Sequence, residues 1–238
     1  SQFVASVSHE LKTPLTAISG YVDHLSSGRP GPLSESQAKI LGSTVSNIKR
    51  LTRQIKDLLD FTAIEAGHFT INLQPFELKP LLDETAANHR IAAETKGLEL
   101  TVAVEPAAAD VFVRADRERI YQVIENLLTN AIKFTDAGSV SLAARAKDET
   151  GIELSVIDTG IGIPGESLGK IFDRFHQADG SSIRRHGGVG LGLAIVKSIL
   201  DAHNAAISIA SAPGQGTTFS FILPAAPDPG AVSGPERA

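Results

Sequence analysis

The chain has 238 residues, of which 42% are hydrophobic and 21% charged; its formal net charge is −5, and it contains neither cysteine nor methionine. This composition suits a soluble globular protein of one large or two small domains, and it excludes disulfides, thiolate metal sites and cysteine nucleophiles. The acidic balance argues against a general nucleic-acid binder, and no apolar run approaches the roughly 20 residues that cross a bilayer. The absence of methionine indicates a piece of a longer protein.

Residues 1 to about 26 predict one amphipathic helix, because apolar side chains recur at steps of three and four residues. The apolar series is Val4, Val7, Leu11, Leu15, Ile18, Val22 and Leu25. At about 100° per residue, His9 falls nearly opposite Val7 and Leu11, so we expect it to face water beside small and polar residues. Pro14 removes a backbone donor and predicts a bend just beyond His9.

The neighbours of His9 suggest chemistry, although an exposed histidine is also compatible with an ordinary surface residue. Glu10 can accept the proton on the imidazole nitrogen that does not react, which makes the other nitrogen a better nucleophile. Thr13 lies one turn further along the same face, within reach of the same small volume. His9, Glu10 and Thr13 are therefore the candidate catalytic residues of this helix.

A second long helix is predicted from about 35 to 66. Breaker residues fill 26–34, Ser34 and Gln37 fit a capping box, and Gly67 is the expected end of the helix. The two helices form a hairpin whose apolar faces one partner helix cannot cover, so we expect a dimeric four-helix bundle. A basic group on the second helix fits a solvated helix face better than a binding site; it comprises Lys49, Arg50, Arg53 and Lys56.

After residue 73 the pattern changes to mixed helix and strand. We expect helices over 78–96, 116–134 and 191–203, and strands over 98–105, 111–114, 138–147, 152–158, 206–211 and 216–223. This order predicts an α+β sandwich, a sheet covered on one side by helices. The predicted organisation is a dimerisation domain at 1–66, a hinge at 67–73, a second domain at 74–224 and a flexible tail or linker at 225–238.

The helix over 116–134 carries an amide pair, a cation and an aromatic ring near one side. Asn126 and Asn130 are one turn apart, and Lys133 and Phe134 lie close by. Amide oxygens suit Mg²⁺, which takes few protein ligands beside water and phosphate oxygens. Two asparagines that cap neighbouring backbone would give the same pattern, so the helix alone leaves both interpretations open.

Two glycine-bearing segments follow. Asp158 ends an apolar strand and can accept a hydrogen bond from an adenine amino group, while Gly160 and Gly162 let backbone approach the base. Gly188, Gly190 and Gly192 run into a helix whose N-terminal N–H groups can face phosphate. A single glycine-rich loop has many false positives, and this one does not fit the P-loop pattern. The polar stretch 176–187 suits a lid, and Thr217 lies where a tight turn enters the last strand.

The string Ser6 to Leu15 resembles the H-box of sensor histidine kinases. The segments 125–134, 158–164, 171–176 and 187–193 resemble, in order, the N, G1, F and G2 boxes of the same family's catalytic domain, a Bergerat-type ATP fold shared with certain chaperones, gyrases and mismatch-repair ATPases. The resemblance implies that Asn130 ligates Mg²⁺ with Asn126 assisting, that Lys133 contacts phosphate and that Phe134 packs on adenine. It further implies that Asp158 reads the adenine amino group beside Gly160 and Gly162. The remaining implied residues are Gly188, Gly190 and Gly192 at the lid hinge and phosphates, and Thr217 near the base.

The family further implies an ATP-dependent protein-histidine kinase that autophosphorylates His9 and passes the phosphoryl group to an aspartate of a response-regulator receiver domain. Phosphatase activity toward that partner, with Thr13 orienting water, is a second expected activity. A homodimer in the cytoplasm is expected, joined to a membrane only through a missing upstream region if at all. The alternatives are an ATP-binding dimeric scaffold, a pseudokinase without transfer, and a chaperone-like ATPase; the last disagrees with Asn126, where those families have glutamate.

Overall fold

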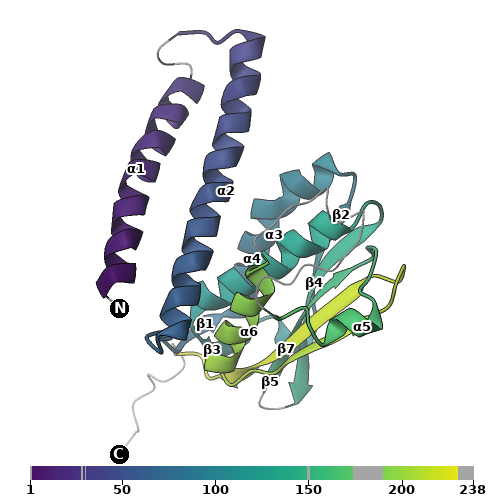
Figure 1. Ribbon diagram of the computed structural model, residues 1–238. Helices are drawn as coiled ribbons and strands as arrows, with labels where there is room; N and C mark the ends of the chain where they lie inside the picture. The colour runs from purple at the N-terminus through teal and green to yellow at the C-terminus, as the bar shows by residue number, and fades with distance from the viewer. Residues whose placement is uncertain (1, 28, 30, 149–150, 174–189, 230–238) are drawn as a thin grey trace, which may run out of the picture. The chain divides into compact units, whose positions relative to one another are not determined.

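The computed structural model describes residues 2–27, 29, 31–148, 151–173 and 190–229 of the chain (Figure 1). The chain divides into two compact units, Ser1–Phe69 and Thr70–Ala238. The first unit is helical and the second mixes strands with helices. Within the described residues, no helix combines the length and the apolar character needed to span a membrane.

The first unit is a helical hairpin of α1 (Gln2–Ser26) and α2 (Glu35–Glu65). The predicted capping box is present, since the Gln37 backbone N–H donates to Ser34 Oγ at 3.3 Å and the Ser34 N–H donates to Gln37 Oε1 at 2.8 Å. At the other end, Gly67 has a φ of +66°, the left-handed conformation that ends a helix without Cβ strain. Both predicted helices are confirmed; α1 runs through Pro14, where the bend stays a prediction.

The two helices bury only part of their apolar surface against each other. Val22 of α1 is buried and lies with Val45 and Ile48 of α2 around a small hollow. Large apolar side chains on both helices remain exposed in the single chain, namely Ile18, Tyr21 and Leu25 of α1 and Ile40, Leu51 and Leu58 of α2. Exposed apolar rows of this kind favour burial against another chain. They support the expectation of a paired hairpin.

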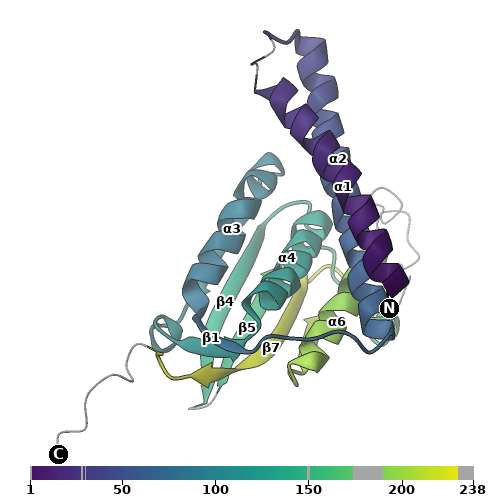
Figure 2. The same ribbon diagram turned by 90° about the vertical axis from the view of Figure 1, so that its left-hand side faces the viewer.

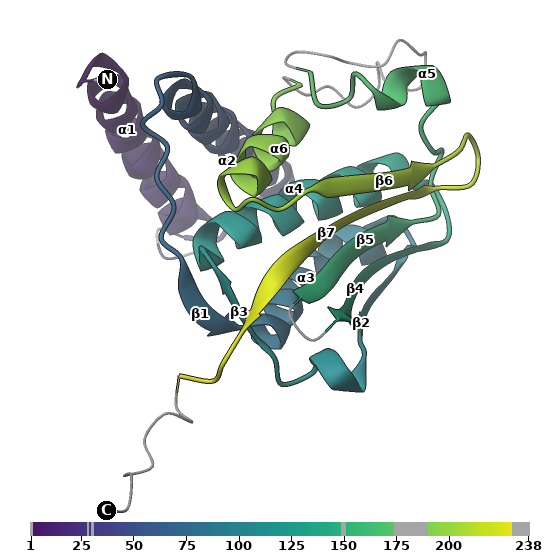
Figure 3. The ribbon, with the colours of Figure 1, turned by 90° about the horizontal axis from the view of Figure 1, so that it is seen from below.

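The second unit is built on a mixed sheet. Seven strands are present in the described part: β1 (Gln74–Glu77), β2 (Glu99–Val104), β3 (Phe112–Ala115), β4 (Ser139–Asp148), β5 (Gly151–Asp158), β6 (Ile207–Ser211) and β7 (Thr217–Ala226). The order is β1-β3-β7-β5-β4-β2, and β6 also pairs with β7 (Figure 3). The β2–β4 pair is parallel, whereas the other pairs are antiparallel. β7 thereby pairs with β3, β5 and β6, and β5 lies between β7 and β4.

Helices cover one face of this sheet, as Figure 2 shows for α3 (Leu78–Thr95), α4 (Arg117–Phe134) and α6 (Gly192–Ala202). Between them and the sheet lies the core, whose largest fully buried side chains include Leu81, Leu82, Ile124, Leu128, Leu142, Ile195, Ile199 and Phe221. A short α5 (Gly165–Leu168) and a 3₁₀ turn, Pro106–Ala108, complete the described elements. The predicted α+β sandwich is confirmed, with element ends within a few residues of those expected.

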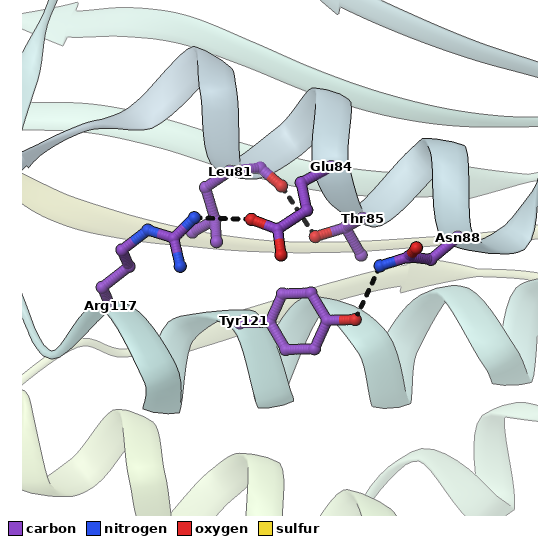
Figure 4. Close-up of polar contacts among 6 residues, drawn as sticks. All are labelled: Leu81, Glu84, Thr85, Asn88, Arg117 and Tyr121. Atoms are coloured by element: carbon purple, nitrogen blue, oxygen red, sulfur yellow. Dashed lines mark hydrogen bonds and ion pairs between the residues drawn. The ribbon is translucent and has the colours of Figure 1, made fainter.

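Polar contacts join α3 to α4 at the rim of the core (Figure 4). The Arg117 guanidinium donates to the Glu84 carboxylate at 2.5 Å, and Asn88 Nδ2 donates to the Tyr121 hydroxyl at 3.1 Å. The α4 helix itself begins at Asp116, whose carboxylate accepts from the Arg119 N–H at 3.1 Å, as the sequence predicted. These contacts fix α4 at its N-terminal half.

The sheet extends further than the sequence predicted at two places. The segment 74–77, where the sequence predicted no strand, is strand β1 and pairs with β3. β7 continues to Ala226, two residues into the segment expected to be a tail, because Ala225 and Ala226 pair with Val113 and Phe112. Both extra strand segments form through backbone pairing with β3, and neither carries an apolar side-chain pattern that would predict a strand.

Candidate functional site

The last turns of α4 carry the predicted amide pair and its neighbours. Asn126, Asn130, Lys133 and Phe134 are all half-buried, so each retains a surface for a ligand. Lys133 Nζ lies 4.7 Å from the centroid of the Phe134 ring, which places a cation next to an aromatic face at the end of the helix. The helix thus presents amide groups, a cation and a ring from successive turns.

Asp158 ends β5 with its carboxylate inside the protein. The residue is 8% exposed, and its Oδ1 accepts hydrogen bonds from the Gly160 N–H at 2.8 Å and the Thr217 N–H at 3.2 Å. Burial raises the pKa of the Asp158 carboxyl above its ordinary value, and these two backbone hydrogen bonds oppose that rise. Within the described part of the chain both bonds end on Oδ1, so Oδ2 stays available as an acceptor.

The loop after β5 lies against the end of α4, and its glycines make the approach feasible. A Cβ on Gly160 would overlap the Phe134 carbonyl oxygen and lie 2.9 Å from Asp158 Oδ1. Beside it, the Ile161 N–H donates to that same carbonyl at 3.2 Å. Gly162 has a φ of +68°, and a Cβ there would overlap the Ala212 carbonyl. The structure therefore brings the predicted residues Phe134, Asp158, Gly160 and Gly162 together.

Thr217 closes the same site from the start of β7. Thr217 is buried, and its backbone N–H donates to the Asp158 carboxylate. The preceding Gly216 has a φ of +77°, and a Cβ there would overlap the Asp158 carbonyl oxygen. Sequence reasoning identified the turn but missed Gly216 as a contact to Asp158; the two glycines of Gly214-Gln215-Gly216 before Thr217 were the available signal.

Ser211, at the end of β6, is a second residue that sequence reasoning missed. Its hydroxyl accepts from the Ile163 N–H at 2.8 Å, donates to the Gly216 carbonyl at 2.8 Å and lies 3.0 Å from the Thr217 hydroxyl. It joins the loop after β5 to the turn before β7. No local motif marks it, because Ile163 lies 48 residues away and the contacts to Gly216 and Thr217 form only when β6 pairs with β7.

Lys96 is a third residue that sequence reasoning missed, and it holds the C-terminal end of α4 in place. Its ammonium donates to the carbonyls of Ile132, Lys133 and Thr135 at 2.8, 2.9 and 3.1 Å. These are carbonyls at and just beyond the last turn of the helix, which lack intrahelical donors and carry the negative end of the helix dipole. Lys96 thereby fixes the turn that bears Lys133 and Phe134.

The glycine-rich segment is described only from Gly190 onward, so Gly188 and the predicted lid at 176–187 lie outside the described residues. Gly190 has a φ of +74°. Gly192 is the first residue of α6, and a Cβ there would lie 3.5 Å from Asn126 Oδ1. The Asn126 amide and the beginning of α6 are therefore close, which places a helix N-terminus beside the amide pair.

The phospho-acceptor candidates lie in the helical hairpin. His9 and Glu10 belong to α1, but their side chains lie outside the described part of the structure. Thr13, Thr16 and Gly20 are exposed, which agrees with the polar face predicted for this helix. The roles given to His9, Glu10 and Thr13 stay predictions.

The candidate metal-ligating side chains of the site fit a cation whose coordination shell is completed by the phosphate oxygens of a nucleotide. Among the described residues no group of three or more histidine, cysteine, aspartate or glutamate side chains could hold a metal ion. Asn130, half-buried on α4, could instead offer its amide oxygen as a single neutral ligand. Mg²⁺ commonly takes such sparse protein ligation when phosphate oxygens and water complete its shell.

Two family models match this chain. The model described as histidine kinase-, DNA gyrase B- and HSP90-like ATPase matches residues 115–227. The model of the His kinase A (phospho-acceptor) domain matches residues 1–67. The first covers α4, β4 to β7 and the site around Asp158, and the second covers the helical hairpin with His9.

Curated relatives match along nearly the whole chain. The circadian input-output histidine kinase CikA of Synechococcus elongatus is 38% identical over 225 residues, which cover 94% of this chain and 30% of that protein. The signal transduction histidine-protein kinase BarA of Escherichia coli is 36% identical over 227 residues, 94% of this chain and 24% of that protein. The chain thus spans less than a third of either relative.

Solved structures match the fold. Full-length ShkA in complex with AMPPNP has a TM-score of 0.75 and 32% identity, over 94% of this chain and 46% of that chain. The Acinetobacter baumannii histidine kinase AdeS has a TM-score of 0.61 over 91% of this chain and 97% of that one; at 24% identity it supports the fold alone.

Proposed function

This chain belongs to the sensor histidine kinases, whose phospho-acceptor and ATPase domain models both match it, and we propose that it transfers the γ-phosphoryl group of ATP to His9. From phosphohistidine the group would pass to an aspartate of a response-regulator receiver domain. The kinase core would occupy residues 1–66 and 74–224, with a hinge at 67–73. Similarity to CikA and BarA supports two-component signalling as the setting.

The observation that carries the proposal is the buried Asp158 carboxylate with its glycine-lined approach. Oδ1 is held by the N–H groups of Gly160 and Thr217, which leaves Oδ2 to accept from an exocyclic amino group. Phe134, at the end of α4, offers an aromatic face in the same place. A carboxylate acceptor beside an aromatic ring is an arrangement that recognises adenine.

The phosphate end of ATP would lie toward Asn130, Lys133 and the N-terminus of α6, with Gly188, Gly190 and Gly192 along it. Backbone N–H groups at a helix N-terminus and a lysine ammonium are favourable partners for phosphate oxygens. Mg²⁺, held by Asn130 with Asn126 assisting, would neutralise charge on the transferring group. Catalysis then consists mainly of positioning and charge neutralisation.

At the acceptor, an imidazole nitrogen of His9 would form the new N–P bond while the bond from the γ-phosphorus to its bridging oxygen breaks and ADP leaves. Glu10 would hold the proton on the other ring nitrogen. Labelling of the chain by γ-labelled ATP with Mg²⁺ tests this step. A chain that binds nucleotide but acquires no label would contradict it.

The assembly would be a homodimer in which the exposed apolar rows of α1 and α2 pair into a four-helix bundle. Residues of both helices near His9 would form the surface for the receiver domain. We place the chain in the cytoplasm, as the kinase portion of a sensor.

Thr13→Ala should separate the two activities proposed for this helix. The Thr13 hydroxyl is exposed one turn beyond His9, where it can orient water toward a phosphorylated receiver. We expect autophosphorylation to stay within about twofold of the unmodified chain, while receiver dephosphorylation falls on the order of a hundredfold, as when a reacting group loses its positioning contact. Both rates can be followed with a labelled receiver domain. Survival of both activities would refute the role given to Thr13.

A further inference from the structure

The hydroxyl of Ser211 meets three polar groups of the site around Asp158. The Ile163 N–H reaches it at 2.8 Å, the Gly216 carbonyl oxygen lies at 2.8 Å and the Thr217 hydroxyl at 3.0 Å. Ser211 itself is half-buried, and both Gly216 and Thr217 are buried. The Gly216 carbonyl and the Thr217 hydroxyl therefore depend on protein partners rather than on bulk water.

The three contacts have one consistent arrangement of protons. A backbone N–H can only donate and a carbonyl can only accept, whereas a serine hydroxyl has one proton and two lone pairs. The single proton of Ser211 is given to the Gly216 carbonyl, and one lone pair accepts from Ile163. The contact to Thr217 is then satisfied only if Thr217 donates its own proton to the second lone pair of Ser211.

This arrangement fixes what Thr217 offers to a ligand. With its proton committed to Ser211, the Thr217 hydroxyl presents only lone pairs on its remaining side. Its neighbour Asp158 is also an acceptor, because Oδ1 is occupied by two N–H groups and Oδ2 faces no donor in the described residues. Two acceptors side by side suit a donor such as an amino group, and they repel a carbonyl oxygen.

We propose that Ser211 is a specificity-determining positioning residue, which holds the Thr217 hydroxyl as an acceptor so that the site selects a 6-aminopurine over a 6-oxopurine nucleotide. This inference rests on the proposed binding of ATP and adds to it the reason for discrimination. The Thr217 hydroxyl acts on the base directly or through one water. Without Ser211 that hydroxyl is free to turn and donate to a 6-oxo group.

The test compares affinities for ATP and inosine triphosphate, which carries the 6-oxo group, in the unmodified chain and in Ser211→Ala. We expect the preference for ATP to fall about fivefold in Ser211→Ala, the size of one modest hydrogen bond. Ser211→Thr keeps the hydroxyl and should restore the preference. Thr217→Val removes the group that Ser211 orients, so adding Ser211→Ala to it should change the preference no further.

A matched control is Ser208→Ala, which removes an exposed hydroxyl from the same strand and should leave the preference unchanged. A merely structural Ser211 would weaken both nucleotides by the same factor, and that result would overturn the inference. So would an unchanged preference in both Ser211→Ala and Thr217→Val. Failure of the unmodified chain to bind ATP would instead overturn the proposed function, so the two failures are distinguishable.

Discussion

Gly160→Ala should weaken ATP binding by about 10- to 100-fold, because a single methyl group has no room at this position. Its carbon would overlap the carbonyl oxygen of Phe134 and press on the Asp158 carboxylate. The loop would have to leave the end of α4, which breaks the hydrogen bond from the Ile161 N–H to Phe134. The adenine acceptor and the aromatic ring would then no longer be held together. Isothermal titration with a non-hydrolysable ATP analogue measures the loss.

Gly165→Ala is the matched control, because a Cβ at Gly165, the first residue of α5, meets nothing within 4 Å. It should leave affinity within about twofold, since an added methyl there creates no overlap and alanine favours a helix. Thermal unfolding of both variants separates a local effect from loss of the fold. Equal affinities for the two variants would show that close approach of the loop to Phe134 is not needed for binding.

His9→Gln should abolish phosphorylation of the chain while ATP still binds. Glutamine keeps a polar side chain of similar length but lacks the imidazole nitrogen that would form the N–P bond. The expected loss is complete within detection, since no other group takes over a missing nucleophile. Nucleotide affinity should stay unchanged, because the residues proposed to hold ATP all lie beyond residue 115. Labelling with γ-labelled ATP and titration with the analogue measure the two effects separately.

His24→Gln offers a control on the same helix. His24 is exposed in the last turn of α1, and its backbone carbonyl accepts from the Ser27 hydroxyl, a contact that the substitution keeps. Labelling of this variant should match the unmodified chain. Retained labelling in His9→Gln would place the phosphoryl group elsewhere and remove His9 from the account.

Local chemistry made most of the fold predictable. The hairpin follows from a capping box at Ser34 and a glycine at 67, and α4 follows from the cap at Asp116. These signals act within a few residues, so the sequence contains them directly. β1 was not predicted as a strand because its four residues are mostly exposed and include a proline, which suits an edge strand but resembles a loop.

In the candidate site, too, the residues that lie in local motifs could be predicted, and those that act through contacts across the fold could not. Asn126, Asn130, Asp158 and the glycines lie in contiguous motifs, so residue type and spacing identified them. Lys96 contacts carbonyls 36 to 39 positions away, and Ser211 contacts Ile163, 48 positions away, as well as Gly216 and Thr217, which it meets across the turn between β6 and β7. A lysine that caps a distant helix and a serine that joins two loops become visible only when the strands and helices are placed.

The central claim is that ATP bound beside Asp158 gives its γ-phosphoryl group to a histidine nitrogen of this chain. The most direct measurement is incubation of the unmodified chain with γ-labelled ATP and Mg²⁺, followed by treatment of the denatured protein with acid or base. A phosphorus–nitrogen bond on histidine predicts a label that is lost in acid and retained in base. A label that survives acid, or bound nucleotide with no label on the protein, would contradict the account.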